Sequence, residues 1–268
     1  MNAQLEKHFA KMGAKLNIIT VSGNARGINP APFSIDIVDR DGVEFFEIQV
    51  NKRFEDSLDL NVLEVRQKDR HLVLLARQLD QEGKAVEKDH FLCGHDERHW
   101  FVAAVSPAST VNEAKDSLKP LPIRRAEVGM KAKKRNRRKT ENFKRQGEWF
   151  FVPENINPDQ NLVLRNEPLT RNALSKPHVA QFCYRDGGEA VKVCSQYPQG
   201  LTIAQYNKLI ARKPSAARRY NWVDMRRGAV VYVRGKIRHA DHATITLNSW
   251  HSVLMNTEAT SERVVFLD

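Results

Sequence analysis

Short β-patterned segments separated by turn sequences recur along most of this chain. Asp39-Arg40-Asp41-Gly42, Gln67-Lys68-Asp69-Arg70 and Gly94-His95-Asp96-Glu97-Arg98 each separate two segments rich in apolar, branched and aromatic residues. Connections this short join antiparallel strands, because a parallel crossover needs a dozen residues or more. The expected elements are a helix within residues 1–14, strands over Leu16–Val21, Phe33–Val38, Val43–Val50, Leu60–Arg66, His71–Arg77, His90–Cys93 and His99–Val105, and a helix over Val111–Leu118 that Pro120 and Pro122 end.

The pattern resumes after residue 146. Arg185-Asp186-Gly187-Gly188 indicates another hairpin turn, and Thr202 is placed to cap a helix. The expected elements are an aromatic strand within residues 147–154 that Pro153 closes, strands over Leu162–Arg165, His178–Tyr184, Glu189–Cys194, Ala229–Ile237, Ala243–Leu247, Ser249–Met255 and Val264–Leu267, and a helix over Thr202–Arg212. Little strand–helix–strand alternation is present, so the fold class is α+β.

The length of 268 residues favours two domains. Residues 123–146 have almost no apolar content and mark the boundary. We therefore expect two β-rich domains of antiparallel hairpins with a few short helices, over residues 1–122 and 147–268, joined by a basic linker or arm over 123–146. The linker is either a basic helix or a segment that becomes ordered on binding.

The chain carries a net charge of +11, and this charge is concentrated. Residues 124–145 carry +9 and residues 212–238 carry +8, so the remainder is mildly acidic. A generic surface mixes both signs, whereas blocks of one sign attract polyanions. This distribution predicts a nucleic acid as the partner.

Three cysteines are too few for a disulfide framework and indicate reduced thiols. The sequence has no signal-peptide pattern and no long apolar run, so we expect a cytoplasmic protein that does not enter a membrane.

The first candidate interface is the basic run in the linker. Closely spaced cations neutralise several phosphates at once and release counterions. The alternative is a solvated linker. The candidate residues are Lys131, Lys133, Lys134, Arg135, Arg137, Arg138 and Lys139.

The second candidate interface mixes arginines with aromatic residues. In a strand over Ala229–Ile237, alternate side chains project from one face, where an aromatic ring can stack a base while cations hold phosphates. The alternative is that Tyr232 and Trp222 belong to the core. The candidate residues are Arg218, Arg219, Trp222, Arg226, Arg227, Tyr232, Arg234, Lys236 and Arg238. We expect Trp222 near Tyr232, and one continuous track formed with the linker.

A group of histidines and one aspartate, His239, Asp241, His242 and His251, is the candidate catalytic site. These side chains suit acid–base chemistry or metal ligation, and the alternative is an ordinary polar turn. His90, Cys93, His95 and His99 also invite a zinc interpretation, but a turn separates them. We assign no metal ligand, and the sequence identifies no cofactor.

Nucleotide-binding and hydrolase motifs such as G-x-x-x-x-G-K-[ST], G-x-G-x-x-G and G-x-S-x-G are absent from the sequence. The sequence therefore predicts a nucleic-acid-binding protein, with RNA or single strands favoured over duplex DNA because aromatics accompany the arginines. One alternative is a hydrolase or nuclease that uses the histidines. Another is a scaffold subunit that grips an acidic protein partner in a larger complex. The oligomeric state stays open.

Overall fold

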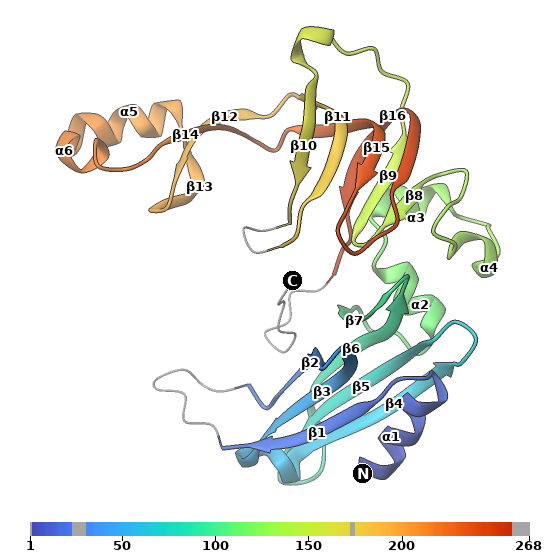
Figure 1. Cartoon of the computed structure of the whole chain (residues 1–268). Helices are drawn as coiled ribbons and strands as arrows, with labels where there is room; N and C mark the ends of the chain where they lie inside the picture. Colours follow the sequence, from blue (N-terminus) through green and yellow to red (C-terminus); the bar gives the residue numbers. More distant parts are fainter. Residues whose placement is uncertain (1, 23–30, 172–174, 259–268) are drawn as a thin grey trace.

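The computed structural model describes residues 2–22, 31–171 and 175–258, so the predicted strand Val264–Leu267 lies outside the described residues. The described chain forms two β-rich bodies, and a narrow projection leaves the second one (Figure 1). The α+β class with predominant antiparallel strands is confirmed. Among the described residues, no helix has the length and apolarity to cross a membrane.

The first body contains two sheets, β1-β3-β2 and β4-β5-β6-β7. All pairs are antiparallel except β1 and β3, which run parallel. The elements are α1 (Asn2–Lys11), β1 (Leu16–Val21), β2 (Phe33–Arg40), β3 (Val43–Asn51), the 3-10 helix η1 (Lys52–Ser57), β4 (Leu58–Arg66), β5 (His71–Leu79), β6 (Ala85–Asp96), β7 (His99–Val105) and α2 (Val111–Ser117).

The core of this body follows from the alternation of side chains along β5. Leu72 and Leu74 enter a core that both sheets share with Phe9 of α1. Val73 points to the opposite face, where it packs against Val111 and other residues of α2. Each fully buried side chain of this size contributes about 1.5–3 kcal/mol. Both faces of the four-stranded sheet are therefore covered by other elements of the first body.

The predicted turns are mostly right. Asp41 and Gly42 both have positive φ, as a two-residue hairpin turn requires. The turn expected over Gly94–Arg98 is shorter, because β6 continues through Asp96 and only Glu97 and Arg98 form the turn. The longer β6 places the carboxylates of Asp96 and Glu97 at the hairpin tip.

Residues 123–146, hereafter the connecting segment, contain regular structure. Pro120 caps α3 (Leu121–Ala126) and Pro122 lies in its first turn, so the prolines that end α2 also begin the next helix. A further turn of helix, α4 (Ala132–Arg135), precedes β8 (Lys144–Gln146). Ile123 and Phe143 pack against Phe150 of the second body. The segment is thus built onto the second body.

The second body is one six-stranded sheet in the order β10-β11-β15-β16-β9-β8. One face buries Phe151, Val233 and Ile237, and the connecting segment covers part of the other. The elements beyond β8 are β9 (Trp149–Pro153), the 3-10 helix η2 (Gln160–Leu162), β10 (Leu164–Leu169), β11 (His178–Asp186), β15 (Val230–Arg238) and β16 (Ile245–Met255).

Residues 187–229, hereafter the extension, form the projection in Figure 1. Its elements are β12 (Glu189–Cys194), β13 (Tyr197–Thr202), α5 (Ile203–Arg212), α6 (Pro214–Ala217) and β14 (Val223–Arg227). Thr202 caps α5 as predicted, in a capping box with Gln205. The hairpin predicted at Arg185–Gly188 is wrong. β11 pairs with β15 and β12 with β14, so the glycines join two stretches of one long ribbon.

Substitution at this joint tests the account of the ribbon. A Cβ at Gly188 would lie 2.7 Å from the backbone nitrogen of Ala229, whereas one at Gly187 would meet nothing within 4 Å, and both residues have positive φ. Gly187→Ala should cost about 1 kcal/mol for the left-handed backbone alone, and Gly188→Ala about 3 kcal/mol because the clash is added. Urea unfolding of both variants measures the difference, and equal costs would contradict the account.

Candidate functional site

The connecting segment and the first body enclose a strongly basic pocket of about 610 Å³. Seven Lys and Arg side chains line it against two carboxylates, Asp69 and Asp96. We call it the basic pocket, and its cations are Arg66, Lys115, Lys119, Lys133, Arg137, Arg138 and Arg145. Lys133, Arg137 and Arg138 belong to the predicted basic run, which here forms one wall of a pocket.

Some cations of the pocket have counterions. Arg138 pairs with Asp96 and Glu97, and Arg66 pairs with Glu64 at 2.9 Å. Within residues 2–22, 31–171 and 175–258, no ion pair engages Lys115, Lys133 or Arg137. Burial lowers the pKa of Lys115, with Asp69 opposing the shift and Arg145 and Arg66 adding to it, and burial lowers the pKa of Arg138 to about 10. The pocket therefore holds positive charge that a bound anion would stabilise.

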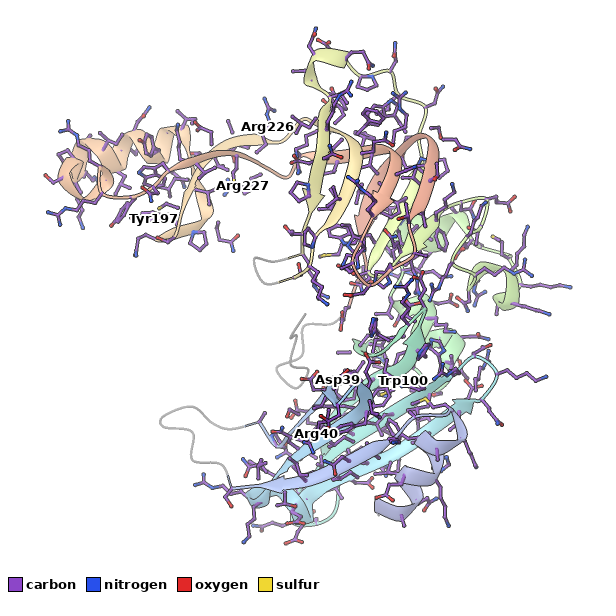
Figure 2. All side chains as sticks on the ribbon, in the orientation of Figure 1. Asp39, Arg40, Trp100, Tyr197, Arg226 and Arg227 are labelled. Atoms are coloured by element: carbon purple, nitrogen blue, oxygen red, sulfur yellow. The ribbon has the colours of Figure 1, made fainter. Side chains whose placement is uncertain are left out.

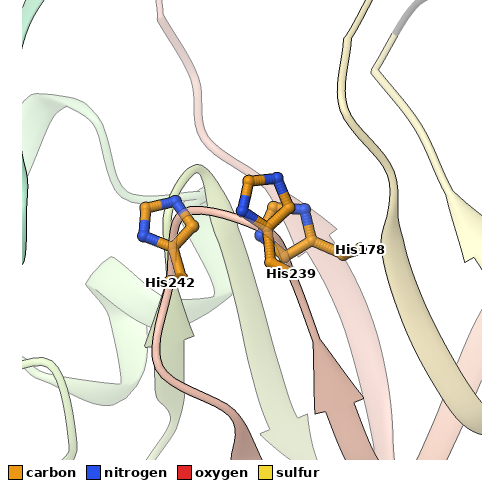
Figure 3. A group of neighbouring side chains, drawn as sticks. All are labelled: His178, His239 and His242. Carbon is orange, nitrogen blue, oxygen red and sulfur yellow. The ribbon is translucent and has the colours of Figure 1, made fainter.

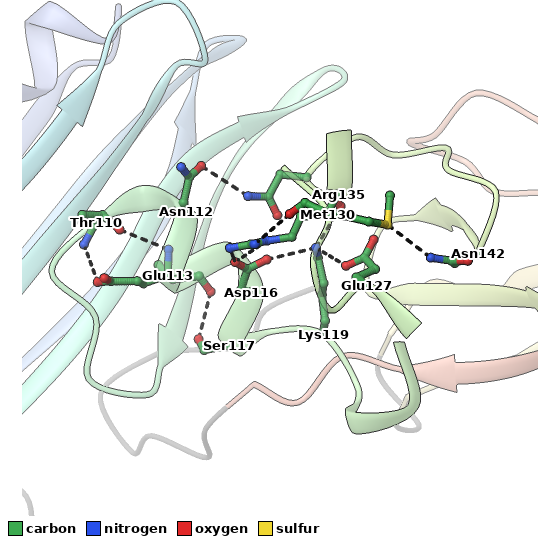
Figure 4. Close-up of polar contacts among 12 residues, drawn as sticks. Thr110, Asn112, Glu113, Asp116, Ser117, Lys119, Glu127, Met130, Arg135 and Asn142 are labelled. Carbon is green, nitrogen blue, oxygen red and sulfur yellow. Dashed lines mark hydrogen bonds and ion pairs between the residues drawn. The ribbon is translucent and has the colours of Figure 1, made fainter. Parts of the chain in front are cut away.

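A buried ion-pair network holds the connecting segment against α2 (Figure 4). Lys119 Nζ lies 2.7 Å from Glu127 Oε2 and 3.0 Å from Asp116 Oδ1, and it donates to Arg135 O at 2.8 Å. Arg135 Nε donates to Asp116 Oδ2 at 2.9 Å. Arg135, predicted to contact nucleic acid, thus has a structural partner. The network fixes the position of α4 and therefore of its exposed side chains, Lys133 and Lys134.

Breaking this network should be costly. Lys119 and Glu127 have side-chain exposures of 5% and 2%, so Lys119→Met leaves a carboxylate buried without its counterion. We expect a loss of about 3–5 kcal/mol in the free energy of unfolding. The matched control is Lys134→Met, which breaks the exposed Lys134–Glu141 pair and should cost less than about 1 kcal/mol. Urea unfolding compares the two, and a cost near the control's would contradict a structural role.

Side chains along β15 alternate between two faces as predicted, and Val233 and Ile237 on one face are buried in the core. On the other face, the Arg234 guanidinium lies 5.0 Å from the ring centroid of Trp250 and 5.5 Å from that of Phe182. Tyr232 stacks on Tyr184 at 6.1 Å, and Arg238 donates to Asn166 at 2.8 Å. Lys236 is exposed on the same strand. Phe182 and Tyr184 of β11, which are not among the predicted residues, complete this face.

Trp222 does not join this face. It lies in the extension, stacked on Tyr197 at 5.8 Å and edge-on to Tyr206 at 5.0 Å, and its Nε1 donates to Ala217 O. The expectation that Trp222 lies near Tyr232 is therefore wrong, because the ribbon continues past Tyr232 into a separate sheet. Trp222 holds the extension together.

The predicted arginines of the extension are exposed. Arg218 and Arg219 follow α6. Arg226 and Arg227 lie at the base of the extension, while Tyr197 lies farther out (Figure 2). Arg226 Nη1 donates to Gly187 O at 2.6 Å, and Arg227 pairs with Glu189 at 2.5 Å. The extension and α4 lie on opposite sides of the second body (Figure 1). The predicted residues therefore form separate surfaces, and the continuous track is wrong.

A cleft of about 530 Å³ lies on the other side of the β6–β7 hairpin tip, between the two bodies. Seven carboxylates line it against three Lys and Arg side chains. The carboxylates are Asp36, Asp39, Glu44, Asp96, Glu148, Asp241 and Glu258. Figure 2 shows Asp39 and Trp100 on the side of the first body that faces the second. This acidic cleft and the basic pocket have opposite electrostatic character.

Three histidines converge at the acidic cleft (Figure 3). His178 begins β11, and His239 and His242 lie in the loop between β15 and β16. Their potential ligand nitrogens all lie within 4.8 Å of one another. We call these residues the histidine cluster. Burial, with the neighbouring imidazoles adding to it, lowers the pKa of His178 to about 3.

The predicted catalytic residues are partly brought together. His239 and His242 belong to the histidine cluster, and Asp241 pairs with Lys176 beside it at 2.8 Å. His251 lies on β16 opposite Val233, about 17 Å along the strand direction from the end of β15, and its Nδ1 contacts Ser249 O. The convergence of His251 with the loop residues is therefore wrong.

The missed member of the cluster is His178. It lies more than sixty residues before its partners, so local spacing gives no signal for it. The only available signal was that the loop offers two imidazoles and a metal site needs a third. The His90–His99 motif is not part of a comparable group among the described residues, since Cys93 is buried in the core.

Comparisons with known protein families, with curated proteins and with solved structures found no match to this chain.

The pH dependence of stability tests whether His71, which lines the basic pocket, is buried in its neutral form. Burial, reinforced by Lys115, lowers its pKa to about 3. The unfolded chain binds this proton below about pH 6.5 and the folded chain does not, so stability falls as the pH falls. Between pH 6.5 and 5, wild type should lose up to about 2 kcal/mol more than His71→Asn. Urea unfolding at both pH values measures this, and an equal loss would contradict a buried neutral imidazole.

Proposed function

We propose that this protein binds nucleic acid through the basic pocket, with the extension as a second contact, and that it prefers RNA or single strands to duplex DNA. The observation that carries the proposal is the set of seven Lys and Arg side chains facing two carboxylates around one pocket. Four of these cations pair with carboxylates of the protein, and a row of phosphates would supply counter-charge to the other three, Lys115, Lys133 and Arg137, which no ion pair engages among the described residues.

The exposed cations of the pocket support this proposal. Lys133 and Arg137 are exposed at its rim, and Lys115 is half-buried inside it. Phosphates that bind here exchange their condensed counterions for protein cations, which favours association at low salt. An arginine at the rim also offers two parallel hydrogen bonds to one phosphate.

The extension supports a second contact. Residues 187–229 carry a net charge of +6, and Arg212, Arg218 and Arg219 are exposed on it. It projects from the second body on the side opposite α4, as Figure 1 shows, so a single strand has to cross the second body to contact both the pocket and the extension. The half-buried stack of Tyr184 and Tyr232 lies on the β15 face and offers a surface for an unpaired base.

A titration of nuclease-treated protein with single- and double-stranded RNA and DNA at several salt concentrations tests the proposal. The pocket variant changes Lys115, Lys133 and Arg137 to Gln. It should weaken single-strand binding at least tenfold and reduce the salt slope by about 2, since each lost phosphate contact removes about 0.7. The matched control changes the exposed Lys7, Lys11 and Lys52 to Gln, with the same loss of charge.

The control separates a site from general positive charge. If both triple variants lose affinity equally, binding is non-specific attraction and the pocket is not the site. If wild type does not bind any of the four nucleic acids at low salt, the proposal is wrong. A second variant, with Arg212, Arg218 and Arg219 changed to Gln, reports on the extension alone.

A hydrolase or nuclease is the second candidate, because His239, His242 and Asp241 lie together at a cleft. Acid–base side chains in a cleft can cleave a phosphodiester bond. Changing His239 and His242 to Ala distinguishes the two: a protein that only binds keeps its affinity, whereas an enzyme loses turnover of a labelled RNA or DNA strand.

A further inference from the structure

We propose that His178, His239 and His242 bind a divalent transition metal of the zinc type at the acidic cleft. This inference does not rest on nucleic-acid binding, which concerns a different pocket. Three imidazoles are the ligand set of many zinc sites, with Zn–N distances of about 2.0–2.1 Å. Tetrahedral ligands at that distance lie about 3.3 Å apart, so the present limit of 4.8 Å has to close by at most about 1.5 Å.

Buried ring nitrogens support the proposal. Both nitrogens of His178 and Nδ1 of His242 are buried without a hydrogen-bond partner in the described structure. Buried polar atoms of this kind destabilise the fold unless a water or ion satisfies them. A metal that binds Nε2 of His178 satisfies one of these atoms, whereas Nδ1 of His242 faces Glu97 Oε2 at 3.6 Å.

The space between two of the rings is shaped by a glycine. A Cβ at Gly147 would lie 2.8 Å from His242 Nε2 and 3.5 Å from His178 Nε2. The two nitrogens therefore converge on a position that has no side chain. Gly147 also has a φ of +56°, which L residues adopt only with strain. The backbone thus keeps open the volume that an ion between His178 and His242 would need.

The charges around the cluster favour a cation. The cleft is lined by seven carboxylates and three Lys and Arg side chains. Glu97 Oε2 lies 3.6 Å from His242 Nδ1 and accepts a hydrogen bond from Ala243 N at 2.8 Å. A carboxylate behind a ligating histidine orients the ring and raises its basicity.

Binding requires a local rearrangement of the rings. The three ring planes lie within 28° of one another, with His178 and His239 stacked at 4.1 Å. His239 Nδ1 accepts from Asp241 N at 3.1 Å, so Nε2 carries the proton that faces Lys176 O at 3.3 Å. The lone pair that a metal would take is therefore on Nδ1, and the bond from Asp241 N has to be exchanged while the one to Lys176 O can stay. His239 lies in a loop, so rotation of its side chain leaves the sheet unchanged.

Two of the three ligands, His239 and His242, line the cleft, so a fourth ligand would enter from there. Asp241 is the nearest carboxylate in the loop sequence, but Lys176 holds it in an ion pair at 2.8 Å. Three protein ligands with one open position are typical of zinc sites that bind water or a substrate oxygen, whereas structural sites are closed by four. The site would therefore take an exchangeable oxygen or nitrogen ligand.

Cobalt binding tests this proposal, because tetrahedral Co²⁺ absorbs visible light and free Co²⁺ hardly does. Full-length protein without a histidine tag is stripped with a chelator and titrated with Co²⁺, then with Zn²⁺ as competitor. We expect one equivalent of bound cobalt with a tetrahedral spectrum, displacement by zinc, and a rise in Tm with added zinc. His178→Ala and His239→Ala should each weaken binding at least tenfold. His99→Ala, which removes another histidine lining the cleft, is the matched control.

His239→Ala keeps the test valid even if the buried His178 is needed for folding, because His239 is only half-buried. Absence of a tetrahedral cobalt spectrum in folded wild type would overturn the proposal. Equal loss of binding in His99→Ala and His239→Ala would also overturn it. Azide added to the cobalt form should shift the visible bands, and an unchanged spectrum would contradict the open fourth position.

Discussion

The two carboxylates at the tip of the β6–β7 hairpin hold the architecture together. Asp96 pairs with Arg138 and lies 3.5 Å from Arg145, while Glu97 pairs with Arg138 and accepts from the backbone nitrogen of Ala243. One hairpin tip from the first body thus contacts the connecting segment and the β15–β16 loop of the second. Both proposed sites depend on this contact, because Asp96 lines the basic pocket and the acidic cleft. Charge-assisted hydrogen bonds of this kind are about twice as strong as neutral ones.

The hairpin tip also separates the charges of the molecule. Asp96 and Arg145 line both the basic pocket and the acidic cleft, with opposite surroundings on the two sides. A polyanion is attracted to one side and a metal cation to the other. The two proposals therefore concern different surfaces. The residues of the predicted basic run fall into two groups. Arg135 and Arg138 form ion pairs that hold the connecting segment in place, whereas Lys133 and Arg137 are exposed.

Local sequence patterns predicted the elements better than their arrangement. Alternating apolar residues and turn sequences located most strands, and Thr202 marked the start of α5. The same local signal misled at Gly187 and Gly188, because a glycine pair suits a hairpin turn and a joint in a ribbon equally well. Which strand pairs with which depends on contacts far apart in sequence. For the same reason His239 and His242 were found from their loop, whereas His178 could only be placed by the fold.

The central claim is that a polyanion binds on the basic side of the hairpin tip and leaves the acidic cleft free. Hydrogen–deuterium exchange with and without a single-stranded RNA tests this claim most directly. The account predicts slower exchange in α2 and residues 131–139, with part of the extension affected, and unchanged exchange in residues 239–243. Protection confined to the acidic cleft, or no protection at a saturating RNA concentration, would contradict it.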